Sequence, residues 1–528
     1  MSSFTRRTIM QSGLALASSA AAPRIAFAQR GGGKTIRTVG DITSYDPVVS
    51  ATYSSHYHAT MVYDTLFAYD SQYVPRPQMV DKFAVSDDKL TWTFELRDGL
   101  KFHDGTLVST ADVIPSIRRW GARDGAGQVM MKYVKEISAK DAKTFTIQLK
   151  DHFGLVIDLL GKNCFIMRKK EAETDPAQKI DTVIGSGPFR LNLGETKPGT
   201  QYVYDKFADY VPRKEAPDGL AGGKVVKVDR VIYVNMPDAQ TAVAAVQAGE
   251  IDFYGGPPLD LLDQLSHDRN VKLQVLYAGA NVGIIRFNFL HAPFDSVKCR
   301  QAILNLVNQT DYLKAIIGNP KYYKICGSYF GCDVPMENDA NTSWFKAAPN
   351  YDRAKQLLKE GGYDGRPVIL LQQTSYPPAK IAAEILADQM RRAGIDVRME
   401  PMDGAAMWAR SASKAPPEQG GWHMFITSAA STDADSPLWI CHRTNGEKGW
   451  LGWPTDARNE ELTTEWALGE TVEQRKKIAR EIQENAWNFV PYVWYGQWVQ
   501  PVLMHANLNG VLSTPFAWSA PWWNAEKA

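Results

Sequence analysis

The stretch "LRDGLKFHDGTLVSTADV", residues 96–113, combines two tight turns with the start of a helix. Gly99 and Gly105 each follow an aspartate, and glycine supplies the positive φ that a reversing strand ribbon needs at its corners. Ser109 or Thr110 can then cap a helix, and the aspartate that follows them favours its positive end. We therefore expect a ribbon that reverses twice and leads into a helix, and we assign this stretch to packing rather than to ligand contact.

Length and composition indicate a soluble protein of several domains. The chain has 528 residues, too many for one core, with 44% hydrophobic and 22% charged residues and a net charge of +1. The first 28 residues contain three arginines and no acid, so the remainder carries +1 − 3 = −2. Such a near-neutral body does not point to a nucleic-acid partner, and no later segment is apolar for long enough to span a bilayer.

The N-terminus is typical of an export signal. Arg6 and Arg7 precede a mildly apolar stretch rich in alanine and serine, which ends in the A-x-A cleavage pattern of residues 26–28. The paired arginines predict the twin-arginine route, with a Sec signal as the alternative. We expect a periplasmic protein that is cleaved near Ala28, with residues 1–28 removed.

The five cysteines suit an oxidising compartment. Cys326 and Cys332 enclose the glycine-rich segment "GSYFG", which is short enough to close on itself, so we predict a disulfide between them. Cys164 and Cys299 lie in apolar contexts and are expected to be buried thiols. Cys441, beside a histidine, keeps a minor metal-binding alternative.

Alternating and helical patterns predict a mixed α/β protein without an internal repeat. Residues 91–99 and 144–149 alternate like half-buried strands. Residues 367–374 and 396–402 read as strands on either side of a helix at 378–395. A strand–helix–strand succession of this kind implies parallel pairing in an α/β sheet.

Motifs of enzyme chemistry are absent from the sequence. It contains no G-x-S-x-G elbow, no H-E-x-x-H pair and no phosphate-binding loop of the required spacing. Its nine histidines are scattered, so we predict no metal site and no cofactor. These observations favour a binding protein over an enzyme and leave an exported hydrolase as a weaker alternative.

The opening stretch resembles the signature of the solute-binding proteins of ABC importers for peptides and nickel. The pattern of that family is approximately L-R-x-G-V-x-F-H-D-G-x-P-h-T-A-x-D-V. Other segments are similar to the family in the same order, so that the resemblance covers essentially the whole mature chain. These segments are residues 64–70, 184–191, 287–316, 351–363 and 490–511.

The resemblance implies an α/β fold of the type II periplasmic-binding-protein kind, a Venus flytrap with two lobes and three domains. In such a protein the ligand touches both lobes only in the closed state and therefore stabilises that state. Two crossing strands near 279–287 and 497–503 would form the hinge. The expected boundaries are 29–66, 185–282 and 498–528 for the first domain, 67–184 for an inserted second domain, and 283–497 for the third.

The resemblance also implies a function. We expect a monomeric extracytoplasmic component of an ABC importer, which binds a small peptide or similar solute and delivers it to the permease subunits in the membrane. The same fold with an oligosaccharide, an opine or a nickel chelate remains the main alternative.

One block supplies the first ligand-binding candidate. Residues 426–439, "ITSAASTDADSPLW", resemble the family segment D-x-x-x-P, in which the aspartate pairs with the α-amino group of the peptide. The spacing assigns this role to Asp433, four positions before Pro437. A buried carboxylate facing an ammonium forms a charge-assisted hydrogen bond and rejects ligands that lack a free amine.

The sequence departs from its dipeptide-binding relatives at the carboxylate clamp. Those relatives hold the ligand carboxylate with an arginine shortly before the Y-D/N block, where this chain has Ala347, Ala348 and Pro349. Arg410 and Arg443 are the candidate substitutes. A dipeptide ligand is therefore in doubt, and a longer peptide or another solute remains open.

Aromatic residues complete the list of cleft candidates. Twelve of the fifteen tryptophans lie between residues 408 and 523, and flat aromatic rings stack on varied ligands without demanding one sequence. Most of these rings are expected in the core. We place only Trp408, Trp422 and Trp439 in the cleft, together with Tyr53.

Replacing Arg6 and Arg7 together by lysine tests the export route. The twin-arginine system reads this pair, so we expect the uncleaved precursor to remain in the cytoplasm. Cell fractionation and immunoblotting would measure its distribution, and normal export of the double variant would indicate the Sec route.

Overall fold

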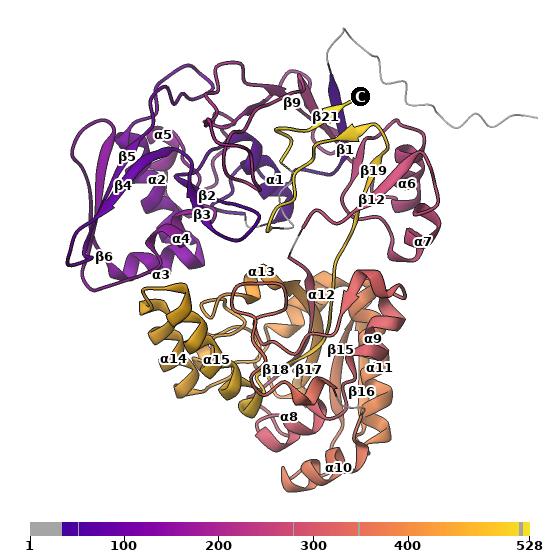
Figure 1. Cartoon of the computed structure of the whole chain (residues 1–528). Coiled ribbons are helices and arrows are strands. Elements are labelled where there is room, and N and C mark those ends of the chain that lie inside the picture. Colours follow the sequence, from indigo (N-terminus) through magenta and orange to yellow (C-terminus); the bar gives the residue numbers. More distant parts are fainter. Residues whose placement is uncertain (1–33, 51, 278, 347–348, 517–520) are drawn as a thin grey trace, which may run out of the picture. The chain divides into compact units, whose positions relative to one another are not determined.

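A computed structural model describes residues 34–528 apart from 51, 278, 347–348 and 517–520 (Figure 1). The export signal expected at 1–28 lies outside these residues. Residues 34–528 form one compact unit. Among the residues that the structure describes, no helix is both long and apolar enough to cross a membrane.

A seven-stranded sheet joins three stretches that are far apart in the chain. Strands β1, β10 and β11 run parallel, and the remaining neighbours pair antiparallel. Because the sheet includes strands from both ends of the described chain, neither end forms a separate unit. In spatial order its strands are β12 (Val271–Gln274), β19 (Val502–His505), β11 (Phe253–Tyr254), β1 (Thr35–Val39), β10 (Arg230–Val234), β9 (Gln201–Lys206) and β8 (Phe189–Leu191).

An antiparallel four-stranded sheet is built from residues 80–149 alone. Its order is β4 (Val80–Val85), β5 (Thr91–Leu96), β7 (Thr144–Leu149) and β6 (Val134–Ala139). Two helices lie between β5 and β6 in the chain, α2 (Thr110–Arg123) and α3 (Gly125–Tyr133), and two come after β7, α4 (Val156–Leu160) and α5 (Lys169–Ala172). Two short strands, β2 (Phe67–Tyr69) and β3 (Pro75–Pro77), pair beside them.

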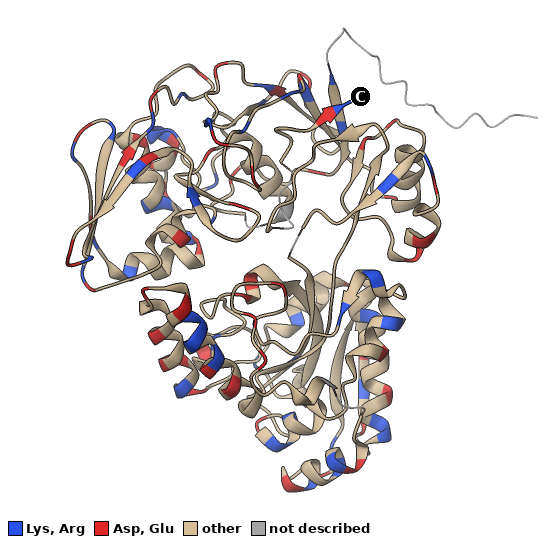
Figure 2. Cartoon of the chain, in the orientation of Figure 1, with Lys and Arg blue, Asp and Glu red and all other residues tan. Residues whose placement is uncertain are grey.

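A six-stranded sheet carries most of the C-terminal half. Strand β15 pairs parallel with β16 across helix α11 (Pro377–Arg392), which confirms the strand–helix–strand unit predicted at 367–402. Strands β15, β17 and β18 contain no charged residue, whereas helices α11 and α14 are studded with charges (Figure 2). The order is β14 (Tyr323–Lys324), β18 (Tyr492–Trp498), β13 (Asn281–Phe287), β17 (Met424–Ala430), β15 (Val368–Gln373) and β16 (Val397–Met402).

The remaining elements cover these sheets or connect their strands. The helices are α1 (Tyr53–Val62), α6 (Ala239–Gln247), α7 (Leu262–Leu265), α8 (Val297–Leu304), α9 (Gln309–Ile316), α10 (Tyr351–Glu360), α12 (Gly404–Ser411), α13 (Ser431–Ala434), α14 (Ala457–Leu468) and α15 (Val472–Phe489). Short 3₁₀ helices lie at Leu259–Leu261, Pro320–Tyr322, Ser343–Lys346, Pro417–Gln419 and Gly446–Lys448. Strands β20 (Leu508–Asn509) and β21 (Glu526–Lys527) pair near the C-terminus.

The stretch 96–113 largely has the predicted form. Gly99 and Gly105 have φ values of 76° and 88°, and helix α2 begins after Ser109 as its N-cap. The Asp112 carboxylate accepts a hydrogen bond from the Ser109 N–H at 3.0 Å, which closes a capping box. The expected second strand of the ribbon is only a single bridge between residues 101 and 107, because too few residues separate the two turns to form a ladder.

His103, inside this stretch, attaches it to another part of the chain. Its Nε2 donates to the Gly187 carbonyl at 3.0 Å, and its Nδ1 accepts from the Gly185 N–H at 3.2 Å. Burial lowers the pKa of His103 to about 4, so the ring is neutral and can serve both roles. The contacts of His103 are therefore those of a packing residue.

The cysteines are arranged in one bridge and three thiols. Cys326 and Cys332 form a disulfide with their Cα atoms 5.8 Å apart, and Cys164, Cys299 and Cys441 are free and buried. Within the described ranges, no group of three or more histidine, cysteine or acidic side chains is placed to hold a metal ion.

Counting thiols tests this arrangement in exported protein. Alkylation of the denatured, unreduced protein should add three labels by mass, and alkylation after reduction should add five. Five labels without reductant would show that the bridge does not form in the export compartment.

Candidate ligand-binding cleft

Two cavities adjoin consecutive residues of one segment, 428–436. The smaller has a volume of about 540 Å³ and is called here the charged cavity; the larger has about 840 Å³ and is called the aromatic cavity. Ser428 and Ala429, at the end of β17, line the aromatic cavity. Thr432, Asp435 and Ser436, in or just after α13, line the charged cavity. Both volumes fall within the usual range for small-molecule sites.

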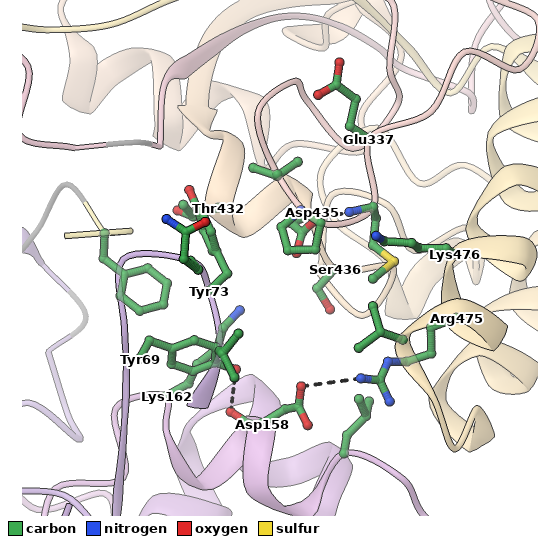
Figure 3. Close-up of a pocket in the computed structure, with 18 of the residues that line it drawn as sticks. Tyr69, Tyr73, Asp158, Lys162, Glu337, Thr432, Asp435, Ser436, Arg475 and Lys476 are labelled. Atoms are coloured by element: carbon green, nitrogen blue, oxygen red, sulfur yellow. Dashed lines mark hydrogen bonds and ion pairs between the residues drawn. The ribbon is translucent and has the colours of Figure 1, made fainter. Parts of the chain in front are cut away.

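The charged cavity brings together distant parts of the chain. Figure 3 shows acidic and basic side chains facing each other across it, with Asp158 and Lys162 opposite Arg475 and Lys476. Its lining comes from residues 69–74, 155–162, 333–337, 432–436 and 466–476, together with Phe516.

Asp158 links the two sides of this cavity. Its Oδ1 lies 3.7 Å from Nη2 of Arg475, and its backbone carbonyl accepts a hydrogen bond from the Tyr69 hydroxyl at 2.8 Å (Figure 3). Burial raises the pKa of Asp158, and the nearby Arg475 opposes that rise. Asp158 and Arg475 therefore form an ion pair without a hydrogen bond, and this pair offsets only part of the cost of burying Asp158.

Other groups in the charged cavity have no such partner. Lys162 lies over the Phe516 ring at 5.9 Å and forms no ion pair with any residue that the structure describes. The hydroxyl oxygens of Tyr73 and Thr432 are buried without a hydrogen-bond partner in the described chain. Buried polar atoms normally have partners, so the two hydroxyl groups are available to a polar ligand, as is the half-buried Lys162 ammonium group.

Asp435 is a carboxylate in a poorly solvated place. Its Oδ1 accepts a hydrogen bond from the Met336 N–H at 2.7 Å. Burial raises the pKa of Asp435 to about 6, against the opposing effects of that hydrogen bond and of Lys162, Lys476 and Arg475. A bound cation would stabilise its ionised form.

The aromatic cavity has far fewer charged lining residues than the charged cavity. Its rings are Tyr57, Tyr277, Tyr376 and Trp498, and its one charged lining residue among those described is Asp260. No lysine, arginine or histidine lines it among the described residues. The cavity is therefore suited to apolar or aromatic groups and not to carboxylates.

A strand edge is open beside the aromatic cavity. Strand β13 pairs with β17 along the whole of β17, from Met424 to Ala430. On the opposite side β15 pairs only with Met424 and Phe425. Within the described chain, Ile426–Ala430 therefore pairs with no strand on that side. Ser428 and Ala429 are half-buried and line the aromatic cavity, whereas Ile426, Thr427 and Ala430 are buried, so an extended partner would reach this edge at Ser428 and Ala429.

Asp433 lies in α13, between the residues that line the two cavities, although it lines neither. Its side chain is half-buried and has no hydrogen bond or ion pair with the residues described. Burial raises the pKa of its carboxyl, an effect that Lys162 opposes. Helix α13 is held by hydrogen bonds of 2.7 Å from the Ser431 N–H to the Ala280 carbonyl and from His442 Nε2 to the Ala434 carbonyl.

The predicted tryptophans do not gather at a cavity. Trp422 is fully buried, packs on Phe425 and donates from Nε1 to the Ser413 carbonyl at 3.1 Å, so it offers no surface to a ligand. Trp408 is partly exposed above Phe425, and Trp439 packs beside a histidine of the core. None of the three lines either cavity.

The predicted arginines are already paired. Arg410 lies 2.9 Å from Glu400, and Arg443 forms an ion pair with Glu460. Neither lines a cavity, so neither is free to clamp a ligand carboxylate in this structure. Tyr53 begins helix α1, and its side chain lies outside what the structure describes. Ligand contacts by these residues remain predictions.

Sequence reasoning missed the residues that do line the charged cavity. Lys162, Arg475 and Tyr73 belong to no motif, and up to 402 positions separate them in the chain (475 − 73). The one available signal was Asp435, which stands in the block already singled out around Asp433.

The chain belongs to the bacterial extracellular solute-binding proteins of family 5. The model of this family's middle region matches residues 74–449. Over 531 residues the chain is 42% identical to the probable peptide ABC transporter periplasmic-binding protein y4tO of Sinorhizobium fredii (strain NBRC 101917 / NGR234), and the match covers 99% of each chain. It is 28% identical to the glutathione-binding protein GsiB of Escherichia coli (strain K12) over 414 residues, which cover 75% of this chain and 76% of GsiB.

Solved structures confirm the predicted type II periplasmic-binding-protein fold. DppA from Helicobacter pylori in complex with the peptide STSA superimposes with a TM-score of 0.77 at 21% identity, covering 94% of this chain and 98% of DppA. AgaA in complex with agropinic acid, from A. tumefaciens R10, gives a TM-score of 0.76 at 20% identity, covering 94% and 99%.

The raised pKa of Asp435 predicts a pH-dependent stability. Its folded pKa of about 6 exceeds the unfolded value, so folding binds a proton and the free energy of unfolding falls as pH rises from about 4 to about 6. Asp435→Asn keeps an acceptor for Met336 and removes this loss. We expect it to be more stable than wild type by about 1–3 kcal/mol at pH 7.5 and equal to it near pH 4.

Urea unfolding of the ligand-free protein across this pH range would measure the difference. Asp87→Asn, at an exposed position between β4 and β5, provides the control and should match wild type throughout. A difference for Asp435→Asn that does not change with pH would contradict the assignment.

Proposed function

We propose that this protein is the extracytoplasmic binding component of an ABC importer and that it captures a peptide-like solute. The observation that carries this proposal is the open edge of β17 at Ile426–Ala430, which adjoins the aromatic cavity. An extended peptide can add to such an edge through main-chain hydrogen bonds while side-chain pockets supply specificity. The proposed peptide partner also agrees with the name of the relative that is 42% identical.

In this proposal Asp433 binds the α-amino group of the peptide. It follows the end of β17 by three residues, and its half-buried carboxylate lacks a hydrogen bond or ion pair with any described residue. Burial already disfavours its charge, so an ammonium group would relieve that cost. Ligands without a free amine would leave the carboxylate unpaired.

The proposed capture step is closure of two lobes. We propose three domains: a first of residues 29–66, 185–282 and 498–528, a second of residues 67–184, and a third of residues 283–497. Each of the three large sheets takes its strands from one of these domains, and no strand crosses a proposed boundary by more than two residues. Glu470 forms ion pairs with Lys89 and, at 3.5 Å, with His152. These pairs join the second and third domains, as a closed state requires.

The remaining parts of the proposal concern the setting of the protein. Residues 1–28 would direct export to the periplasm by the twin-arginine route and be removed near Ala28. The mature protein would act as a monomer, without catalysis, and present its solute to the permease subunits of the membrane transporter.

Replacing Asp433 by alanine tests the proposed role of its carboxylate. The co-purifying solute is first identified by mass spectrometry and removed by mild unfolding, and calorimetric titration then measures its affinity. Losing one partner of a buried charge pair costs about 2–5 kcal/mol. The affinity of Asp433→Ala should therefore be lower than that of wild type by a factor of roughly thirty to several thousand.

Asp87→Ala, at the exposed turn used above, is the matched control and should bind like wild type. The melting temperature of ligand-free Asp433→Ala should not fall, because its carboxylate bonds to no described residue and burial disfavours its charge. Binding within about three-fold of wild type, below ~1 kcal/mol, would remove Asp433 from the site. A co-purified sugar or opine in place of a peptide would assign the protein to a non-peptide solute.

A further inference from the structure

We infer that the cleft recognises only the amino end of its peptide and makes no specific contact with the carboxyl end. The protein would then accept peptides of variable length, including C-terminal amides, whose residues after the first are apolar, aromatic or basic rather than acidic. This inference rests on the proposed function and adds to it a direction and a charge preference for the ligand.

The direction follows from the position of Asp433 relative to the open strand edge. Asp433 comes after the C-terminal end of β17, and the free edge Ile426–Ala430 runs back from there toward the start of the strand. A peptide whose ammonium group meets Asp433 must therefore run antiparallel to β17. Its following residues pass Ala429 and Ser428, which line the aromatic cavity.

The charges of the two cavities then determine where the carboxyl end of the peptide can lie. The described cations of the cleft, Lys162, Arg475 and Lys476, line the charged cavity, beyond α13. The aromatic cavity, into which the tail runs, has no described cation and one carboxylate, on Asp260. A carboxylate desolvated there would be unpaired and repelled, which is costly. The carboxyl end of the peptide must therefore stay in water.

The size of the edge sets the length that is recognised. The unpaired stretch Ile426–Ala430 spans about 13 Å at 3.3 Å per residue, and only Ser428 and Ala429 of it line the cavity, so the edge accommodates at most about four residues of an extended peptide. The rings of Tyr57, Tyr277 and Tyr376 and the apolar Ile316 and Ile381 line the space for their side chains. Residues beyond these would extend past the rim without a fixed contact, so extra length should cost little.

Peptide pools of defined ends test the inference directly. The probes are equimolar pools of random tetrapeptides to hexapeptides in three forms: unmodified, N-acetylated and C-amidated. Stripped protein is incubated with each pool, and native mass spectrometry measures the bound fraction and composition. We expect acetylation to weaken binding at least thirty-fold, amidation to change it less than three-fold, and acidic residues to be depleted after the first position.

The outcomes separate this inference from the function on which it rests. A ten-fold or greater loss on amidation, with normal binding of the unmodified pool, would overturn the inference and keep peptide binding. Failure of all three pools to bind would overturn the proposed function and the inference together.

A gain-of-function variant tests the same point without removing any part of the site. Ala315 is exposed near the end of α9 and lines the aromatic cavity, and both lysine and glutamine are good helix formers. Ala315→Lys would add a cation to the lining of the aromatic cavity, whereas Ala315→Gln adds similar bulk without charge.

The two variants should differ in one respect only. We expect Ala315→Lys to bind the unmodified pool at least five-fold more tightly than the amidated pool, and Ala315→Gln to bind the two pools alike. Equal melting temperatures would show that both variants fold. Equal binding of the two pools by Ala315→Lys would place the tail away from this cavity and overturn the inference.

Discussion

Strand β13 is the constraint on which the cleft depends. It pairs with β17 along Asn281–Phe287 and with β18 over nearly the same length, so it fixes both strands at the centre of the six-stranded sheet. Close packing imposes a requirement on its sequence: a Cβ atom at Gly283 would lie 2.2 Å from the ring of Tyr495. Because β13 uses one edge of β17 completely, whatever binds β17 must come to the other edge.

The order of the strands leaves most of the second edge of β17 without a paired strand. Strand β15 covers only the first two residues of that second edge, and the chain then passes directly from β17 into α13. The unpaired edge at residues 426–430 and the Asp433 carboxylate, which bonds to no described residue, thus follow one another in one segment, and the rings of the aromatic cavity come from other parts of the chain. The two cavities beside this segment differ in charge because four acids and three cations line one of them, whereas prolines and aromatic rings are prominent in the lining of the other, together with a single acid.

Electrostatics in the charged cavity are balanced only in part. Asp158 and Arg475 face each other, whereas burial raises the pKa values of Asp433 and Asp435. Carboxyl groups held in this way lose stability when they ionise, and a cationic ligand restores it. The free protein therefore has a physical reason to favour ligands that carry an amine.

The sequence by itself determined the family, the fold class and several local structures, because these depend on interactions between residues that are near one another in the chain. The capped helix behind residues 96–113, the parallel strand–helix–strand unit at 367–402 and the bridge between Cys326 and Cys332 depend on neighbours within about thirty-five positions. Such neighbours interact through turn geometry, capping and periodicity, which a single sequence displays. The order of the motifs along the chain then indicated the rest of the fold.

Only the tertiary structure decided which side chains line the two cavities. Trp422, Arg410 and Arg443 had the right chemistry for a cleft, but one is buried in the core and two are paired with Glu400 and Glu460. Lys162 and Tyr73, which belong to no motif, line a cavity with residues more than 250 positions away. Burial and ion pairing depend on contacts between distant segments, and those contacts exist only once the strands have been ordered into sheets.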